Sequence, residues 1–134
     1  MLTPADRAAL AQFTEETATR LERIEATLKL LLETRPVNPD LVHGLFRDTH
    51  SLKGAANLLE LTAIEKMAHA LENILDRVRS GQAMPDHTLV TVLRTGYTRI
   101  GQLIKHPHLN RLVDIDREIA TLRRHLEPRT SHGH

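Results

Sequence analysis

The spacing of apolar residues constrains the fold of this chain most strongly. They recur every three or four positions in successive segments, and the first such row is Leu10, Phe13, Leu21, Ile24, Leu28 and Leu31. A helix has about 3.6 residues per turn, so this spacing places them on one side of a helix. Strand-like alternation of apolar and polar residues is missing. We therefore predict an all-α fold in which every helix buries one face.

Prolines and the capping residues before them indicate where two helices begin. Thr3 precedes Pro4 and Asn38 precedes Pro39, so each pair offers a polar cap followed by proline in the first turn. The segment 35–40, RPVNPD, separates these two helices.

Three further helices are expected after Leu59. A capping box formed by Thr62 and Glu65 is the only sign of the first, because neither glycine nor proline marks a break there. The next helix ends before Pro107, and the last spans about 110–126 with Leu112 on its apolar side.

Short connections between these helices predict an antiparallel four-helix bundle with an additional C-terminal helix, five helices in all. We expect one domain over residues 1–127. Residues 128–134 are polar and aperiodic, as in a tail or a truncated linker.

Composition argues against several classes of function. The formal net charge is +1, so no strong field favours nucleic acid or an anionic membrane, and 2% aromatic residues are too few for stacking on bases. The chain has no cysteine for a disulfide or a thiolate metal site. Apolar runs are too short for a membrane span, and the first ten residues do not resemble a signal peptide. We expect a cytoplasmic protein that binds neither nucleic acid nor membrane.

The segment 49–60, THSLKGAANLLE, contains a histidine and a glycine that do not favour a helix. At about 100° per residue, His50 points away from the apolar row of its helix. Gly54 costs that helix about 1 kcal/mol relative to alanine, which is reasonable where a partner must approach the backbone. The alternative is a solvated histidine beside an incidental glycine. Four residues share the outward face of His50: Phe46, Lys53, Gly54 and Asn57.

Two residues farther along could complete a site around His50. His69 and Glu72 are three positions apart on the flank of their helix, where an antiparallel neighbour could bring them close to His50. A carboxylate that accepts a hydrogen bond from one imidazole nitrogen leaves the other nitrogen unprotonated and nucleophilic. Lys53, one turn beyond His50, could neutralise an arriving anion. Ordinary solvated charges are the alternative for Lys53 and Glu72.

The segment from Leu45 to Gly81 resembles the centre of a histidine phosphotransfer (HPt) domain, most closely the N-terminal phosphotransfer domain of chemotaxis-type, CheA-like sensor histidine kinases. HSLKGAA at 50–56 and HALE at 69–72 carry the resemblance. It implies that His50 accepts a phosphoryl group from the ATP-binding domain of a kinase. The histidine would then pass it to an aspartate of a response-regulator receiver domain.

The same resemblance implies roles for the neighbouring residues. Three of them would support catalysis: Glu72, His69 and Lys53. Five would form the docking surface: Gly54, Phe46, Asn57, His43 and Arg47. Glu60 departs from the family pattern, since related sequences usually have glycine there, and this leaves the geometry of the turn after Leu59 open.

No nucleotide-binding motif is present, neither a GxxxxGK[ST] loop nor a kinase-type glycine-rich loop. The resemblance therefore implies that the chain binds no cofactor and that partner domains supply ATP and Mg²⁺. By itself the chain would be a phosphoryl-accepting relay domain and not an enzyme. A longer parent protein would be a sensor histidine kinase.

Two other functions are alternatives to this one. Nine histidines suggest a metal-binding bundle, but paired Glu-x-x-His motifs and HExxH are missing, so no metal ligand is assigned. Four of the histidines are expected at a helix end or in the tail: His106, His108, His132 and His134. The remaining alternative is a non-catalytic scaffold or dimerisation bundle, which would carry no acid-labile, alkali-stable phosphate on His50.

Overall fold

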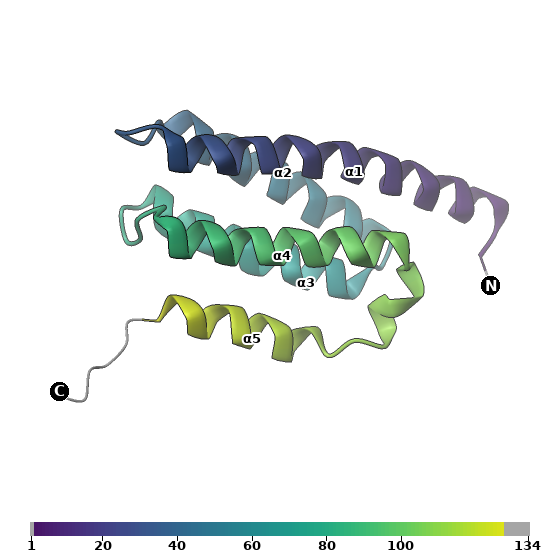
Figure 1. Ribbon diagram of the computed structural model, residues 1–134. Helices are drawn as coiled ribbons and strands as arrows, with labels where there is room; N and C mark the ends of the chain where they lie inside the picture. Colours follow the sequence, from purple (N-terminus) through teal and green to yellow (C-terminus); the bar gives the residue numbers. More distant parts are fainter. Residues whose placement is uncertain (1, 128–134) are drawn as a thin grey trace.

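The computed structural model describes residues 2–127, which form an all-helical bundle (Figure 1). Its elements are α1 (Pro4–Glu33), α2 (Pro39–Leu58), α3 (Thr62–Arg79), α4 (His87–Lys105), the 3₁₀-helix η1 (Pro107–Arg111) and α5 (Ile115–Leu126). The predicted fold class and the number of α-helices are confirmed. Met1 and the predicted tail at 128–134, with His132 and His134, lie outside the described residues.

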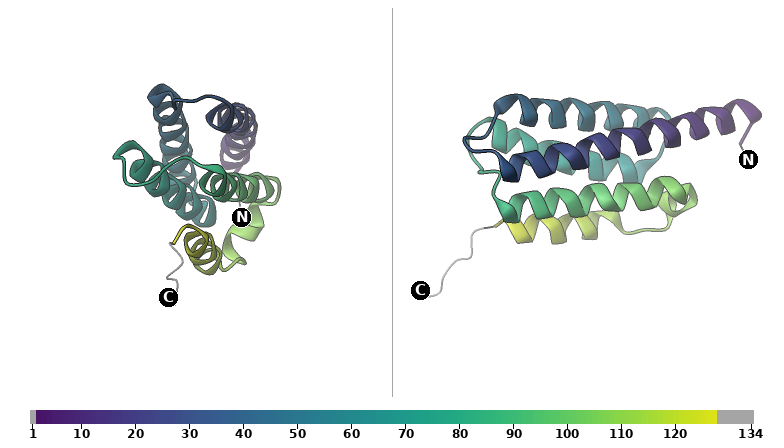
Figure 2. Two further views of the ribbon diagram at one scale, coloured as in Figure 1. Left: turned by 60° about the vertical axis from the view of Figure 1, so that its left-hand side comes forward. Right: turned by 45° about the horizontal axis from the view of Figure 1, so that its top comes forward.

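The first four helices form the bundle, and α5 covers one side of it. Helix α1 packs against α2 and α4, α3 packs against the same two helices, and α5 lies against α3 and α4. Figure 2 shows this arrangement along the bundle and from its side, with the N-terminal part of α1 extending beyond the other helices. The face formed by α2 and α3 is therefore left uncovered by α5.

Leucine and isoleucine side chains from the four bundle helices meet in a single core. Leu28 of α1, Leu52 of α2, Leu71 of α3 and Leu93 of α4 have no exposed surface. Burying one such side chain stabilises the fold by roughly 1.5–3 kcal/mol. Within residues 2–127, no helix is both long and apolar enough to cross a bilayer.

The two predicted proline starts are confirmed. The Thr3 hydroxyl accepts a hydrogen bond from the Asp6 N–H at 3.0 Å, and the Asp6 carboxylate accepts one from the Thr3 N–H at 3.1 Å. Asn38 caps α2 by accepting from the Asp40 N–H at 2.9 Å. Both caps satisfy N–H groups that lack a partner within the first turn of a helix.

The predicted capping box at the start of α3 is wrong. Leu61 is the N-cap, Thr62 is already helical, and no side chain of this segment caps the helix. Asn110 of η1 supplies the missing acceptor instead, because its Oδ1 accepts from the buried Ile64 N–H at 3.1 Å. The cap of α3 is therefore a tertiary contact with a segment that is remote in sequence.

The predicted start of the last helix is also wrong. The chain first forms η1 and then α5, whose N-cap is Asp114, with its carboxylate accepting from the Arg117 N–H at 3.2 Å. Leu112, expected on the apolar side, lies in the link between the two and is 74% exposed. The end at Leu126 agrees with the prediction.

The turn between α2 and α3 places Glu60 in the left-handed region, with φ of 58°. The Leu61 N–H donates to the Ala56 carbonyl at 2.9 Å, and the Glu60 N–H donates to the Asn57 carbonyl at 3.1 Å. These two bonds define a Schellman motif, which usually has glycine in the left-handed position because a Cβ is unfavourable there. Glu60 thus adopts the conformation that glycine would adopt, at a cost in stability.

We expect Glu60→Gly to stabilise the folded chain by up to about 1 kcal/mol, because glycine adopts the left-handed conformation without strain. Part of this gain is lost, since glycine also increases the conformational entropy of the unfolded chain. The melting temperature, followed by circular dichroism, should rise by roughly 2–6 °C. Glu22→Gly is the matched control, because Glu22 is a solvent-exposed residue in the middle of α1. Glycine there should destabilise the fold by about 1 kcal/mol. A lower melting temperature for Glu60→Gly would contradict this account of the turn.

Candidate functional site

His50 lies in the middle of α2, and its side chain is 64% exposed. The buried residues of α2 lie on the opposite side of the helix and include Leu45, Leu52 and Ala56. The imidazole is therefore accessible to a partner molecule, as the apolar spacing of the helix predicts.

Glu72 of α3 connects His50 and Lys53 of α2. Its Oε2 lies 2.6 Å from His50 Nδ1, and its Oε1 accepts a hydrogen bond from Lys53 Nζ at 2.8 Å. An ionised carboxylate can only accept hydrogen bonds, so Nδ1 must carry a proton. In the neutral imidazole, this leaves the lone pair on Nε2, the nitrogen directed away from the carboxylate.

The environment of Glu72 keeps it ionised. Burial alone would raise the pKa of Glu72, but hydrogen bonds from Lys53 and His50, together with the positive charge of Lys53, lower it below its ordinary value. The Glu72 side chain is only 10% exposed, so the alternative of an ordinary surface charge is wrong. The predicted approach of a neighbouring helix, which brings Glu72 to His50, is confirmed. The carboxylate is buried because α2 packs over this part of α3.

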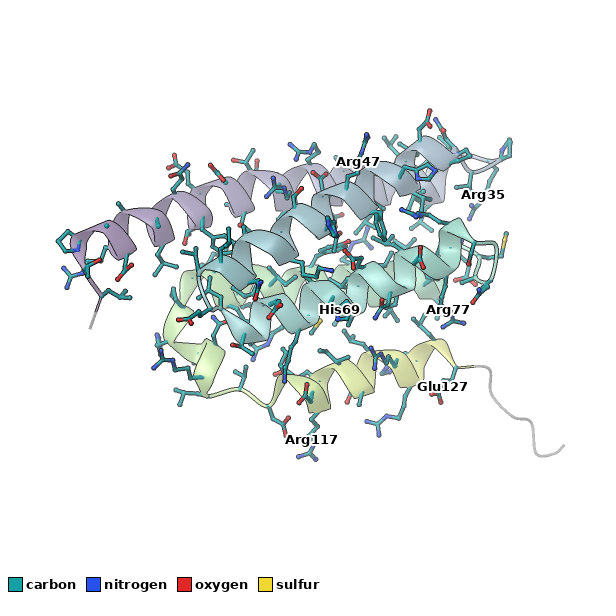
Figure 3. All side chains as sticks on the ribbon, turned by 180° about the vertical axis from the view of Figure 1, so that it is seen from behind. Arg35, Arg47, His69, Arg77, Arg117 and Glu127 are labelled. Carbon is teal, nitrogen blue, oxygen red and sulfur yellow. The ribbon has the colours of Figure 1, made fainter. Side chains whose placement is uncertain are left out.

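The other predicted supporting residue, His69, stands apart from this cluster. Its side chain is exposed on α3, and no hydrogen bond links it to His50 or to any other described residue. Figure 3 shows α2 and α3 side by side on this face, with Arg47 on α2 and with His69 and Arg77 on α3. The structure thus brings together His50, Lys53 and Glu72 and leaves His69 outside.

The surface around His50 is open on α2. A Cβ added to Gly54 would meet no heavy atom within 4 Å, so the absent side chain leaves free space. Three of the other residues assigned to the docking surface are exposed: His43, Arg47 and Asn57. The fourth, Phe46, is half-buried. A partner can therefore approach the helix closely at the turn after His50.

A buried hydroxyl pair lies beneath the site and was not predicted from sequence. The Thr49 hydroxyl donates to the Leu45 carbonyl at 2.7 Å, so Tyr97, 2.6 Å away, must be the donor in the Thr49–Tyr97 bond. Burial raises the pKa of Tyr97 above its ordinary value and keeps the phenol neutral. The bond ties α4 to the residue next to His50, and only the packing of distant helices reveals it.

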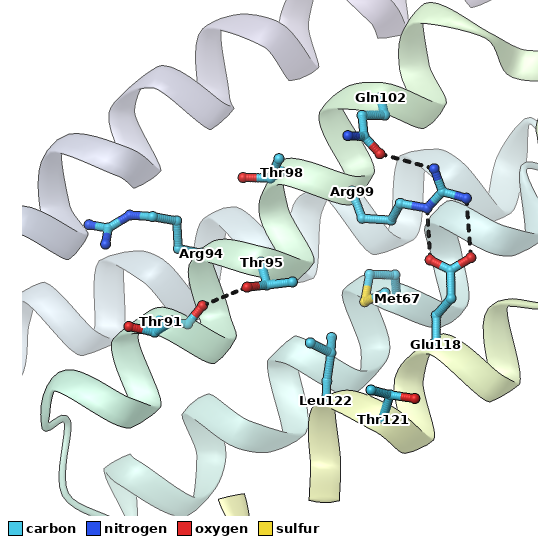
Figure 4. Close-up of a pocket in the computed structure, with 10 residues that line it drawn as sticks. All are labelled: Met67, Thr91, Arg94, Thr95, Thr98, Arg99, Gln102, Glu118, Thr121 and Leu122. Atoms are coloured by element: carbon cyan, nitrogen blue, oxygen red, sulfur yellow. Dashed lines mark hydrogen bonds and ion pairs between the residues drawn. The ribbon is translucent and has the colours of Figure 1, made fainter. Parts of the chain in front are cut away.

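A groove away from these residues lies between α4 and α5 (Figure 4). It has a volume of about 490 Å³, and its lining includes Thr95 and the ion pair of Arg99 with Glu118, whose nearest atoms are 2.7 Å apart. His50, Lys53 and Glu72 do not line it. Within residues 2–127, no three His, Asp or Glu side chains are grouped to hold a metal ion.

Comparison with known proteins identifies the class to which this fold and site belong. Residues 8–103 match the Hpt domain family, so the chain belongs to the histidine phosphotransfer domains. It is 32% identical to chemotaxis protein CheA of Treponema pallidum (strain Nichols) over 96 residues, which cover 72% of this chain and 12% of the relative.

Two further comparisons agree. The chain is 30% identical to chemotaxis protein CheA of Listeria monocytogenes over 119 residues, covering 87% of this chain and 19% of the relative. It thus spans less than one fifth of the length of these two proteins. The fold is similar to a solved structure, the phosphorylated P1 domain of CheA3 in complex with CheY6 from R. sphaeroides, with a TM-score of 0.70. The two sequences are 22% identical, and the match covers 87% of this chain and 97% of that chain.

We expect Glu72→Gln to reduce the free energy of unfolding at pH 7 by roughly 1–3 kcal/mol, because Lys53 and His50 lose a charged acceptor. The pKa of Glu72 is lowered by folding, so its ionisation stabilises the native state above its ordinary pKa, about 4.3, and this contribution is lost as the pH falls through the lower folded value. The difference between wild type and variant should therefore narrow in acid.

Urea unfolding followed by circular dichroism at pH 7, 5 and 3 measures this difference. Glu65→Gln is the matched control, because Glu65 is a half-buried glutamate of α3 without a hydrogen bond to a described side chain. A difference that is constant across this pH range would show that the Glu72 charge does not stabilise the fold.

Proposed function

We propose that this chain is the phosphotransfer domain of a chemotaxis-type phosphorelay. In this proposal, His50 accepts a phosphoryl group from the ATP-binding domain of a histidine kinase and passes it to an aspartate of a receiver domain. The observation that carries the proposal is the exposed imidazole whose Nδ1 is held by the buried Glu72 carboxylate at 2.6 Å. Membership of the Hpt domain family supports the same function.

The geometry suits Nε2 for nucleophilic attack. Its lone pair would form the N–P bond with the γ-phosphorus of ATP, while the P–O bond to the β-phosphate breaks and ADP leaves with that electron pair. Positive charge then develops on the imidazole, and the carboxylate 2.6 Å from Nδ1 stabilises it. Glu72 therefore orients the ring and lowers the energy of the transition state without touching the phosphoryl group.

The second transfer reverses these changes at His50. A carboxylate oxygen of the receiver aspartate would attack phosphorus, and the electron pair of the N–P bond would return to Nε2. Lys53, half-buried and one turn from His50, places a positive charge beside the site in both steps. Such transfers depend mainly on positioning and charge stabilisation, which a rigid bundle can provide.

The proposal assigns the remaining chemistry to partner domains. ATP and Mg²⁺ would be bound by the kinase and the receiver, so this chain alone would be a substrate and relay and not an enzyme. A receiver partner is supported by the R. sphaeroides structure, in which a P1 domain is in complex with CheY6. A sensor histidine kinase as the parent protein, acting in the cytoplasm, is part of the same proposal and is supported by the CheA relatives.

Labelling with a CheA-type kinase domain and radioactive ATP tests the function directly. Wild type should acquire one acid-labile, alkali-stable phosphate per chain, and His50→Gln should acquire none while its helical circular dichroism spectrum is unchanged. His69→Gln is the matched control and should be labelled at a rate within about twofold of wild type, since His69 is exposed and outside the hydrogen-bonded cluster. Label that persists in His50→Gln would assign the reaction to another residue.

Gly54 tests the direction from which the receiver approaches. Arginine at this position should keep the melting temperature within a few degrees, because the site is exposed and a Cβ meets no atom within 4 Å. It should nevertheless slow phosphoryl transfer to a receiver by at least roughly tenfold, equivalent to about 1.4 kcal/mol in the barrier, by obstructing the surface beside His50.

Gly54→Ala provides the control for this experiment. Alanine should raise the stability of α2 by up to about 1 kcal/mol and leave most of the transfer, because a methyl group extends little beyond the backbone. The measurement is the rate at which labelled chain loses phosphate after receiver and Mg²⁺ are added. Unchanged transfer from Gly54→Arg would place the docking surface elsewhere.

A further inference from the structure

An aromatic contact restrains the imidazole of His50 in addition to Glu72. The ring of Phe46, one turn earlier on α2, lies nearly parallel to the imidazole, with 6.2 Å between ring centroids and 8° between planes. This separation is within the range of offset aromatic stacking, about 4.5–7 Å. Phe46 is half-buried and packs against the core, so its position depends on the rest of the bundle.

Phe46 is in turn contacted from α3. The guanidinium carbon of Arg79, the last residue of that helix, lies 3.9 Å from the centroid of the Phe46 ring. Arginine over an aromatic face is attracted to the negative charge of the ring face and stacks with its own plane. The contact joins the C-terminal end of α3 to the aromatic ring beside His50.

We propose that Arg79 is a positioning residue for His50 and that it acts through Phe46. This inference rests on the proposed function of His50 as phosphoryl acceptor. The last torsion of a histidine side chain has a broad, roughly two-fold energy profile, so one hydrogen bond at Nδ1 leaves the ring some freedom to tilt. A parallel ring held in place from α3 restricts that tilt and keeps Nε2 in one direction.

The contacts of Arg79 distinguish this role from that of a docking cation. The guanidinium lies on Phe46, and it also forms an ion pair with Asp76, one turn earlier on α3, at 3.5 Å. The side chain is 32% exposed, so it is partly withdrawn from solvent. The charge of Arg79 is therefore directed at Phe46 and Asp76 of this chain. A partner would chiefly contact the Phe46 ring and the His50 imidazole.

Nuclear magnetic resonance of the His50 ring tests the proposal without any partner. Long-range proton–nitrogen spectra report the tautomer of an imidazole, and its carbon-bound protons report the neighbouring aromatic ring. In the full chain, Arg79→Ala should shift the His50 ring signals, and Phe46→Leu should shift them further. Arg79→Lys should shift them less than Arg79→Ala, because it retains a cation near the ring.

Two matched variants separate positioning from loss of charge. Arg77→Ala removes the same side chain from an exposed position of α3 that makes no cation–π contact with a described aromatic ring. Asp76→Asn removes the ion-pair partner and leaves Arg79 over Phe46. Both should retain the wild-type His50 signals. The four variants other than Phe46→Leu should melt within a few degrees of wild type.

Kinetics of labelling complete the test. At saturating kinase domain, Arg79→Ala should lower kcat by roughly three- to tenfold and leave KM within about twofold, because an oriented ring accelerates the reaction more than it aids binding. Unchanged His50 signals, or the same shifts in Arg77→Ala, would overturn the proposal. An effect confined to KM would also overturn it and make Arg79 a docking residue. Failure of wild type to be labelled would refute the proposed function, whereas the His50 spectra would still decide the positioning.

Discussion

The buried carboxylate of Glu72 is the interaction on which the site depends. A carboxylate withdrawn from water is costly unless charged or polar groups surround it, and both of its partners come from α2, at positions one helical turn apart. This pairing specifies the register of α2 against α3. It also places the proton on Nδ1, because an ionised Glu72 can only accept a hydrogen bond, and this leaves the lone pair on Nε2, the nucleophile of the proposed function.

The part of α2 that carries His50 is held by a hydrogen bond on its buried side and is open to solvent on its exposed side. Beneath the helix, the Thr49–Tyr97 hydrogen bond connects α2 to α4 inside the core. Above it, Gly54 removes the side chain that would otherwise cover the next turn. A relay domain needs this combination, since an in-line transfer requires a nucleophile in a constant position and free access for two different partners.

The turn at Glu60 shows how the same arrangement limits stability. Only a short link separates α2 from α3, and the chain can reverse there through the left-handed conformation of one residue. Glutamate is less suited to that conformation than glycine, yet the two Schellman hydrogen bonds are formed. The cost is tolerated because the helices that follow and precede the turn share a large apolar interface.

The number of helices, two of their proline starts and the outward direction of His50 were determined by the sequence itself. These features depend on local spacing: the helical period sets the buried face, and Thr3 and Asn38 cap helices through neighbouring N–H groups. The family resemblance, too, depends on a short segment, which explains why His50, Lys53 and Glu72 could be named without coordinates.

The tertiary structure alone decided how these elements meet. The cap of α3 comes from Asn110, the burial of Glu72 comes from the helix packed over it, and the contact of Arg79 with Phe46 joins two helices. His69 and Glu72 are three positions apart and look equivalent in sequence, but only Glu72 reaches His50. The rotation of each helix about its axis relative to its neighbours is set by packing of the whole core, which no local pattern of residues specifies.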